Sequence, residues 1–201
     1  MNTIDNERFS IFSYGWFNTQ KQKAVMRKEH QQTQTISWVY EYIKSERAKW
    51  ATEEFRKIPA TATKFEKNNF KVLHFESATF SGIFPLRSAA GLKSRTPFLS
   101  LDFDHLQSIK EARKFQQMFI HDPYVETALS FVSPSGQGVK WIVELPEWTE
   151  GLAFREQFEK MRNYICFNYG IDPDISGSDV CRTCFLPWDD ECYINPKYVS
   201  K

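Results

Sequence analysis

From residue 97 onward, hydrophobic and polar positions follow two clear periods. Alternation of apolar and polar residues predicts strands, whereas apolar residues three or four apart predict helices. The expected strands cover residues 97–103, 125–132, 138–145 and 179–187, and the expected helices cover about 107–120 and 150–168. His121-Asp122-Pro123 ends the first of these helices, because the residue before a proline disfavours helical backbone. The predicted order is therefore β-α-β-β-α-β.

This order predicts an α+β fold with a ferredoxin-like or RNA-recognition-motif-like core. In such a core, both helices cover one face of an antiparallel sheet. We expect the other face of the sheet to stay free for a ligand.

Residues 1–95 are predicted to form an N-terminal α/β elaboration packed on the core of residues 96–201, giving one integrated domain. Its expected elements are a short strand over 9–17 with a turn at Gly15, a helix over 35–58 ended by Pro59, with Trp50 and Phe55 in a second helix after a bend, and one or two strands over 70–84.

Composition narrows the class of protein. The chain has 201 residues, of which 41% are hydrophobic, so a substantial core can form. No stretch approaches the ~20 apolar residues of a membrane-spanning helix, and the polar N-terminus lacks the features of a signal peptide. We therefore expect a cytoplasmic protein without a membrane partner.

Charge is unevenly distributed along the chain. Residues 1–100 carry 16 Lys and Arg against 9 Asp and Glu, whereas residues 101–201 carry 10 against 16. A basic half joined to an acidic half suits a protein that grips phosphates on one side and holds a metal on the other.

Two acids stand at the end of the first core strand, in Leu101-Asp102-Phe103-Asp104. Strand side chains alternate between faces, so Asp102 and Asp104 should point the same way. Adjacent carboxylates repel each other unless a cation lies between them, and Mg²⁺ and Mn²⁺ prefer oxygen ligands. The pair therefore indicates a divalent metal site, with a pair of solvated acids at a strand exit as the alternative.

Two further segments carry polar chemistry. In Ser135-Gly136-Gln137-Gly138-Val139-Lys140 the glycines allow a tight turn whose backbone N–H groups can approach an anion, and Lys140 can meet a phosphate as a point charge. The alternative is an ordinary hairpin. The segment 172–182 offers Asp172, Asp174 or Asp179 as a third carboxylate and Arg182 as a second phosphate contact; the alternative is an acidic loop capped by its own turns.

The four cysteines are Cys166, Cys181, Cys184 and Cys192. They allow a four-thiolate zinc site, but a spacing of three within a strand would put Cys181 and Cys184 on opposite faces. Small buried hydrophobic residues are the favoured interpretation.

The acids, the lysine that follows the glycine turn and the arginine are together the residue types that nucleotidyl transfer requires. The chain also resembles the VirE N-terminal/BT4734-like primase-like domains, a branch of the archaeo-eukaryotic primase and primase-polymerase superfamily. The motifs that carry this resemblance are Phe80-Ser81-Gly82 with Arg87, Leu99 to Asp104, Asp122-Pro123-Tyr124, Val132 to Lys140, Ser178 to Arg182, and Tyr193 to Pro196.

The resemblance implies roles for individual residues. Asp102 and Asp104 match the superfamily's metal pair, and Lys140 stands where its second motif ends in a histidine. Asp172, in Ile-Asp-Pro, is the first choice for the third catalytic and metal-binding acid, with Asp174 and Asp179 as alternatives. The implied phosphate-binding residues are Ser135, Gly136, Gly138, Lys140 and Arg182; Phe185 replaces a frequent second arginine.

The implied activity is that of a DNA primase or primase-polymerase, which uses Mg²⁺ or Mn²⁺, NTPs or dNTPs, and single-stranded DNA as template and primer. Members of this branch often precede a helicase-like region in mobile-element proteins, so a helicase region or partner chain is an expected partner. The competing hypotheses are a catalytically silent nucleic-acid- or nucleotide-binding module and a different metal-dependent enzyme, such as a nuclease or a cyclic-nucleotide synthase.

Overall fold

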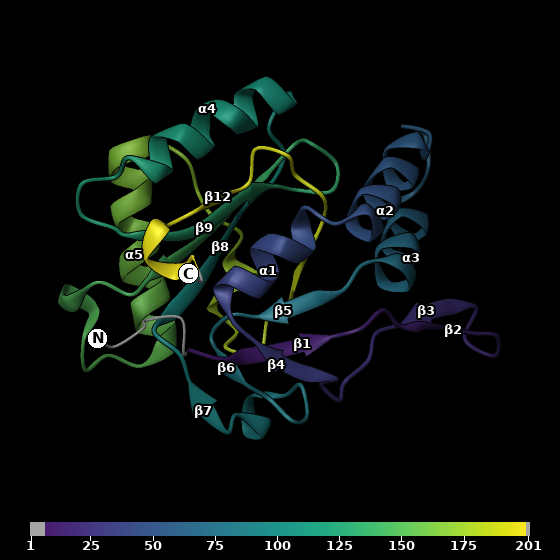
Figure 1. Ribbon diagram of the computed structural model, residues 1–201, viewed down its shortest axis with the longest axis horizontal. Helices are drawn as coiled ribbons and strands as arrows, with labels where there is room; N and C mark the ends of the chain where they lie inside the picture. The colour runs from purple at the N-terminus through teal and green to yellow at the C-terminus, as the bar shows by residue number, and fades with distance from the viewer. Residues whose placement is uncertain (1–6, 200–201) are drawn as a thin grey trace.

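The computed structural model describes residues 7–199, so the outermost residues of both predicted segments, 1–6 and 200–201, lie outside the described chain. The described residues form two four-stranded sheets with helices around them (Figure 1). The helices are α1 (Ile36–Ile43), α2 (Glu46–Lys57), α3 (Lys64–His74), α4 (Ile109–Ile120) and α5 (Phe154–Tyr169). Short 3-10 helices are η2 (Ala89–Gly91), η3 (Glu147–Thr149), η4 (Ile175–Ser178) and η5 (Pro196–Tyr198).

The first sheet has the strand order β12-β9-β10-β8 and is antiparallel between neighbours. Its strands are β8 (Phe98–Phe103), β9 (Thr127–Val132), β10 (Val139–Glu144) and β12 (Tyr193–Ile194). The second sheet has the order β11-β5-β1-β4 and consists of β1 (Phe9–Phe12), β4 (Gln32–Gln34), β5 (Ser77–Thr79) and β11 (Cys184–Phe185). Two small hairpins complete the strands: β2 (Trp16–Asn18) with β3 (Lys23–Val25), and β6 (Gly82–Ile83) with β7 (Ser94–Arg95).

Alternation along β8 divides its side chains between two cores. Leu99, Leu101 and Phe103 pack with α4 and α5 on one face of the sheet. There Phe119 of α4 stacks on Trp141 of β10, with ring centroids 4.5 Å apart. Phe98 points to the opposite face, together with Ser100 and Asp102, because side chains two apart along a strand share a face.

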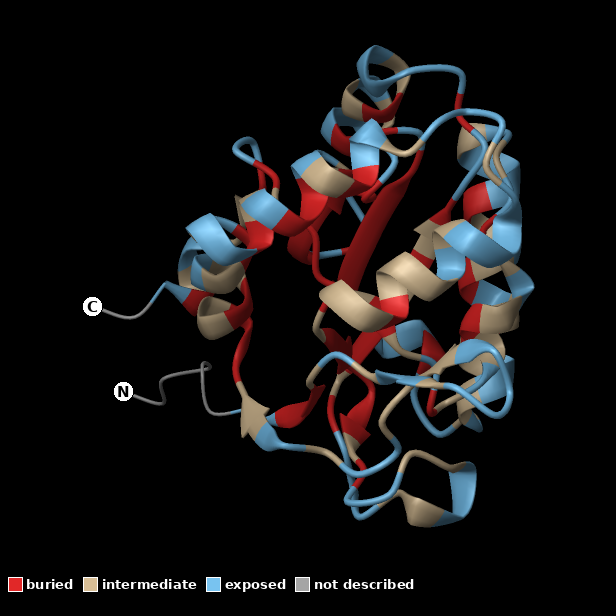
Figure 2. Ribbon diagram, turned by 90° about the vertical axis from the view of Figure 1, so that its right-hand side faces the viewer, coloured by how far each residue is buried: buried red, intermediate tan, exposed pale blue. Residues whose placement is uncertain are grey.

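The second sheet covers that opposite face. Phe9, Ile11 and Ala78 of the second sheet pack in one buried cluster with Phe98 and Ile142 of the first. In Figure 2, buried residues accordingly gather along the strands in the interior, while the helices turn exposed residues outward. The expectation of a free sheet face is therefore wrong, because the second sheet packs on this face through apolar residues. The polar side chain of Asp102 lies at one end of the same face.

The mixed α+β class is confirmed, and the strands and helices expected between residues 97 and 169 all form. The strand expected over 179–187 is wrong, because only β11 is extended there and it pairs with β5 of the second sheet. The side chains of Asp174 and Asp179 accept hydrogen bonds from the backbone N–H groups of Ser176 and Cys181, which favours turns over strand pairing. The fourth strand of the first sheet is β12, so the strand order differs from a complete split β-α-β core.

In the N-terminal half, the bend in the predicted helix lies at Ser45, whose side chain caps α2 by accepting from the Ala48 N–H group. The expected turn at Gly15 separates β1 from β2. Two strands form within the segment 70–84, β5 and β6, as expected, but residues 70–74 belong to α3, which the capping box of Thr63 and Glu66 starts. In the described residues, no helix has both the length and the apolar character needed to cross a membrane.

The stacked pair in the α4–sheet core makes a stability prediction. Phe119 is fully buried, so Phe119→Ala should lower the free energy of unfolding by about 3–5 kcal/mol through lost packing and a cavity. Phe167→Ala on α5 is the matched control, because that ring is 89% exposed and its loss should cost no more than about 0.5 kcal/mol. Urea unfolding measures both; equal losses would contradict the assignment of the core.

Candidate metal and nucleotide site

Three carboxylates meet where β8 ends. Asp102 is the fifth residue of β8, Asp104 directly follows the strand, and Asp174 comes from the segment after α5. One oxygen of each carboxylate lies within 4.8 Å of the others, which is the kind of spacing that a shared cation requires. Among the described residues this is the one group of three or more His, Cys, Asp or Glu side chains with such spacing.

A backbone hydrogen bond brings Asp174 to the strand. The N–H group of Asp174 donates to the carbonyl oxygen of Asp102 over 2.8 Å. The Asp174 side chain then caps η4 by accepting from the Ser176 N–H group at 2.9 Å. Gly177 permits this close approach, because a Cβ atom there would lie 2.7 Å from the ring of Phe158.

Lys140 lies directly opposite Asp102 in the β8–β10 register. Its ammonium group contacts Oδ1 of Asp102 and lies 3.9 Å from Oδ1 of Asp104. Burial alone would lower the pKa of Lys140, but the two carboxylates outweigh it and raise the pKa, so the ammonium stays charged.

The acids respond to the same surroundings in different directions. Burial raises the pKa of Asp102; Lys140 lowers it, and the neighbouring carboxylate of Asp104 raises it again. Burial also acts to raise the pKa of Asp174, but hydrogen bonds from Ser176 hold that pKa below its ordinary value. With all groups ionised, three carboxylates and one ammonium leave two negative charges at this point.

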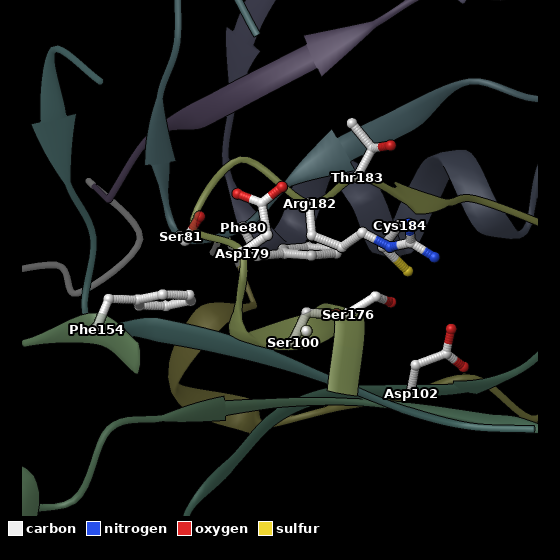
Figure 3. A pocket seen from close by; sticks show the side chains of 11 residues that line it. Phe80, Ser81, Ser100, Asp102, Phe154, Ser176, Asp179, Arg182, Thr183 and Cys184 are labelled. Atoms are coloured by element: carbon white, nitrogen blue, oxygen red, sulfur yellow. The ribbon is translucent and has the colours of Figure 1, made fainter. Parts of the chain in front are cut away.

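Two more cations lie near the group. A guanidinium nitrogen of Arg182 is 3.9 Å from Oδ2 of Asp174. Figure 3 shows the guanidinium of Arg182 and the carboxylate of Asp102 at the same end of a small pocket between the two sheets, whereas Asp179 points to its other side. Lys71 of α3 is the second cation: burial lowers its pKa, the charge of Lys140 lowers it further, and Asp104 and Asp102 oppose the shift. Sequence reasoning missed Lys71, because no motif marks it.

The glycine turn is a closed hairpin. Gly136 has a left-handed φ of +76°, and its N–H group donates to the carbonyl oxygen of Ser133 at 2.9 Å, so it is used within the turn rather than offered to an anion. The Ser135 hydroxyl group contacts that of Ser133 at 3.2 Å. A Cβ atom on Gly138 would lie 2.9 Å from Oδ1 of Asp104, so this glycine makes room for the carboxylate.

The structure places the other predicted acids elsewhere. Asp172, the first choice for the third acid, pairs with Arg162 of α5 through two contacts of 2.6 Å and lies outside the three-carboxylate group. Asp174, one of the two alternatives, takes the place in the group. Asp179, the other alternative, accepts from the Cys181 N–H group at 3.0 Å.

The cysteines do not gather. All four thiols are free, and no metal-spaced group in the described chain includes one. Cys166 is exposed beside Asp172, whereas Cys184 is buried next to the site, where burial raises the pKa of its thiol to about 12. A neutral thiol supports the interpretation of Cys184 as a small buried hydrophobic residue.

The residues present fit a divalent cation. Oδ1 of Asp102 is buried and makes no hydrogen bond of good geometry, although the Lys140 ammonium contacts it. Three carboxylates offer the hard oxygen ligands that Mg²⁺ and Mn²⁺ prefer, and they outnumber the two cations that pair with them, Lys140 and Arg182. Asp102, Asp104 and Asp174 would hold such an ion.

Metal affinity should distinguish the two candidate third acids. Asp174→Asn removes a ligand charge from the group, so Mn²⁺ binding, measured by calorimetry, should weaken by at least ~10-fold. Asp172→Asn is the matched control and should leave the affinity within about 2-fold, because exposed ion pairs such as that with Arg162 contribute little. A loss confined to Asp172→Asn would refute the assignment of Asp174.

Comparison with known families adds one finding. A family model described as BT4734-like, N-terminal domain, matches residues 74–194. The matched segment runs from the last residue of α3 to the end of β12 and contains the three carboxylates, Lys140 and Arg182. No curated protein and no solved structure matches the chain. Because the match spans more than half of the 201 residues, the chain belongs to the family of BT4734-like N-terminal domains.

Proposed function

We propose that this chain is a metal-dependent nucleotidyltransferase, a DNA primase or primase-polymerase that joins NTPs or dNTPs on a single-stranded DNA template. The observation that carries the proposal is the group of Asp102, Asp104 and Asp174, whose buried Asp102 oxygen has an ammonium as its close neighbour. The resemblance of the surrounding motifs to primase-polymerases supports the same activity.

Each charged residue has a task in this proposal. Divalent ions, when bound, supply the charge neutralisation that phosphoryl transfer needs. Asp102, Asp104 and Asp174 orient the ion at the end of β8. Lys140 stays protonated and therefore neutralises phosphate charge rather than accepting a proton. Arg182, about half exposed, is free to leave Asp174 for a phosphate.

A second candidate function rests on Lys140 itself. Its ammonium already neutralises part of the charge of Asp102 and Asp104, as a metal ion would. Phe185, three residues beyond Arg182, offers no second cation for a triphosphate. These two observations favour a module that binds nucleic acid or nucleotide without catalysis.

Synthesis assays separate the two candidates. Wild-type protein should make or extend primers on single-stranded DNA with Mg²⁺ or Mn²⁺. Changing Asp102→Asn and Asp104→Asn together should reduce the rate by at least ~10²–10³-fold, because preorganised electrostatic groups dominate such reactions.

Asp172→Asn should retain the activity, because its carboxylate lies outside the group. Circular dichroism should show that each variant keeps its fold. Wild-type protein that binds single-stranded DNA but makes no product with either metal, any nucleotide or a helicase partner would establish the non-catalytic module.

Replacing Lys140 should affect the two ligands in opposite directions. Lys140→Met keeps the length of the side chain but removes a charge that competes with the metal. Mn²⁺ affinity should rise at least ~10-fold, since charges about 4 Å apart near a protein surface interact by up to ~4 kcal/mol. Nucleotide affinity at saturating Mn²⁺ should fall. Calorimetry measures both affinities, and unchanged values for both would remove Lys140 from the site.

A further inference from the structure

Exposed aromatic rings and cations gather on the N-terminal half of the molecule, away from the three carboxylates. We call this set the aromatic–cation row; it consists of Tyr14, Trp16, Arg27, Arg47, Trp50 and His74. Tyr14, Trp16 and Trp50 are each between 45% and 48% exposed, and exposed Tyr and Trp rings are enriched at binding interfaces. These rings therefore need an explanation other than packing.

Rings and cations alternate along the row. The guanidinium carbon of Arg47 lies 5.3 Å from the ring centroid of Tyr14 and 4.7 Å from that of Trp50, so one cation joins two rings. At one end, Trp50 meets His74 edge-on at 5.6 Å. At the other end, Arg27 lies 5.9 Å from the ring of Trp16. Such distances allow cation–π attraction.

Backbone contacts hold both arginines in place. Arg47 donates from one guanidinium nitrogen to the carbonyl oxygen of His74 at 3.2 Å, and Arg27 donates from Nε to that of Tyr14 at 3.1 Å. The chain segments themselves are pinned together where the Gly15 N–H group donates to the Val72 carbonyl oxygen at 2.6 Å. The remaining guanidinium donors stay available to a ligand, and they are preorganised.

The charge around the row favours an anion. Lys21, Lys23 and Lys28 are exposed on or beside the β2–β3 hairpin, and residues 1–100 carry 16 Lys and Arg against 9 Asp and Glu. The charge of Glu76 interacts with Arg47. Burial raises the pKa of the Glu76 carboxyl group, because it disfavours the negative charge that would compete with an anionic ligand for Arg47. An anion that also offers flat faces to exposed rings is a strand of unpaired bases.

α3 connects the row to the three-carboxylate group. It carries His74 in the row and Lys71 three residues earlier, and the charge of Lys71 interacts with Asp102 and Asp104. In Figure 1, α2, α3 and the β2–β3 hairpin lie together on one side of the molecule, opposite α5. Of the residues in the row, only His74 falls within the family match, which begins at this residue.

We propose that the aromatic–cation row binds single-stranded DNA, with bases stacked on Trp16, Tyr14 and Trp50 and phosphates paired with Arg27 and Arg47. This inference rests on the proposed function, since it supplies the surface that holds the template strand of that reaction. Duplex DNA does not fit, because its bases are already stacked inside the double helix.

Binding can be measured without catalysis. The probe is fluorescein-labelled oligo(dT) of about 16 nucleotides, the upper range of single-strand site sizes, with EDTA and no nucleotide present. Fluorescence anisotropy should show at least ~5-fold weaker binding for Trp50→Ala and ~25-fold for Trp16→Ala with Trp50→Ala, given typical stacking energies. Arg47→Ala should reduce the slope of log affinity against log salt by about 0.7.

Trp148→Ala is the matched control. Trp148 is 40% exposed in η3, which precedes α5 in the chain, and α5 lies on the side of the molecule opposite α2 and α3 (Figure 1), so the loss of this ring should leave binding unchanged. Trp50→Phe keeps a ring and should retain most of the affinity, which separates stacking from a folding defect. Melting curves of all variants should coincide with that of the wild type.

The outcomes also separate this inference from the proposed activity. Variants of the row that bind oligo(dT) like the wild type, or a wild type that does not bind it, would overturn the inference. Wild-type protein that binds through the row but makes no product supports the inference and refutes the polymerase. Primer synthesis with binding that is insensitive to the row refutes the inference alone.

Discussion

The ion pair between Lys140 and Asp102 is the constraint around which the site is built. The two residues lie opposite each other in adjacent strands, so the pair forms only in the observed β8–β10 register. A shift of one residue would turn Lys140 toward the apolar face, where Trp141 and Phe119 stack. Buried charges are tolerated only when they are paired. The pair and the apolar residues on both faces thus agree on one register, which places Asp104 just beyond the strand end.

Local sequence patterns were sufficient to predict how Asp102, Asp104 and Lys140 are placed, because these residues come from one strand and one hairpin. Strand alternation predicted that Asp102 and Asp104 share a face, and the glycine turn predicted that Lys140 begins the neighbouring strand. The structure brings all three together. The sequence pattern could not predict the partner of Lys140. A lysine at this position could equally bind a phosphate or pair with an acid of the neighbouring strand, and in the structure it pairs with Asp102.

The third acid depends on packing that the sequence does not encode locally. Asp172 and Asp174 are two residues apart, and either could face β8. The choice is made by Arg162 on α5, which pairs with Asp172, and by the hydrogen bond from Asp174 to β8. The turns closed by the side chains of Asp174 and Asp179 favour a non-extended backbone up to Cys181, and β11 is accordingly short. Lys71 of α3, whose charge interacts with Asp102 and Asp104, lies in a segment whose alternation resembles that of a strand.

A shared core joins the basic half and the acidic half of the chain. Phe9 and Ile36 of the basic half are buried in one cluster with Ile142 and Tyr198 of the acidic half. Because interior packing is dense, the two sheets hold each other in place rather than hinge freely. α3 carries His74, which belongs to the aromatic–cation row, and Lys71, whose charge interacts with Asp102 and Asp104. A strand bound along the row as proposed would therefore lie at a distance from the three carboxylates that is set by the fold rather than by a flexible linker.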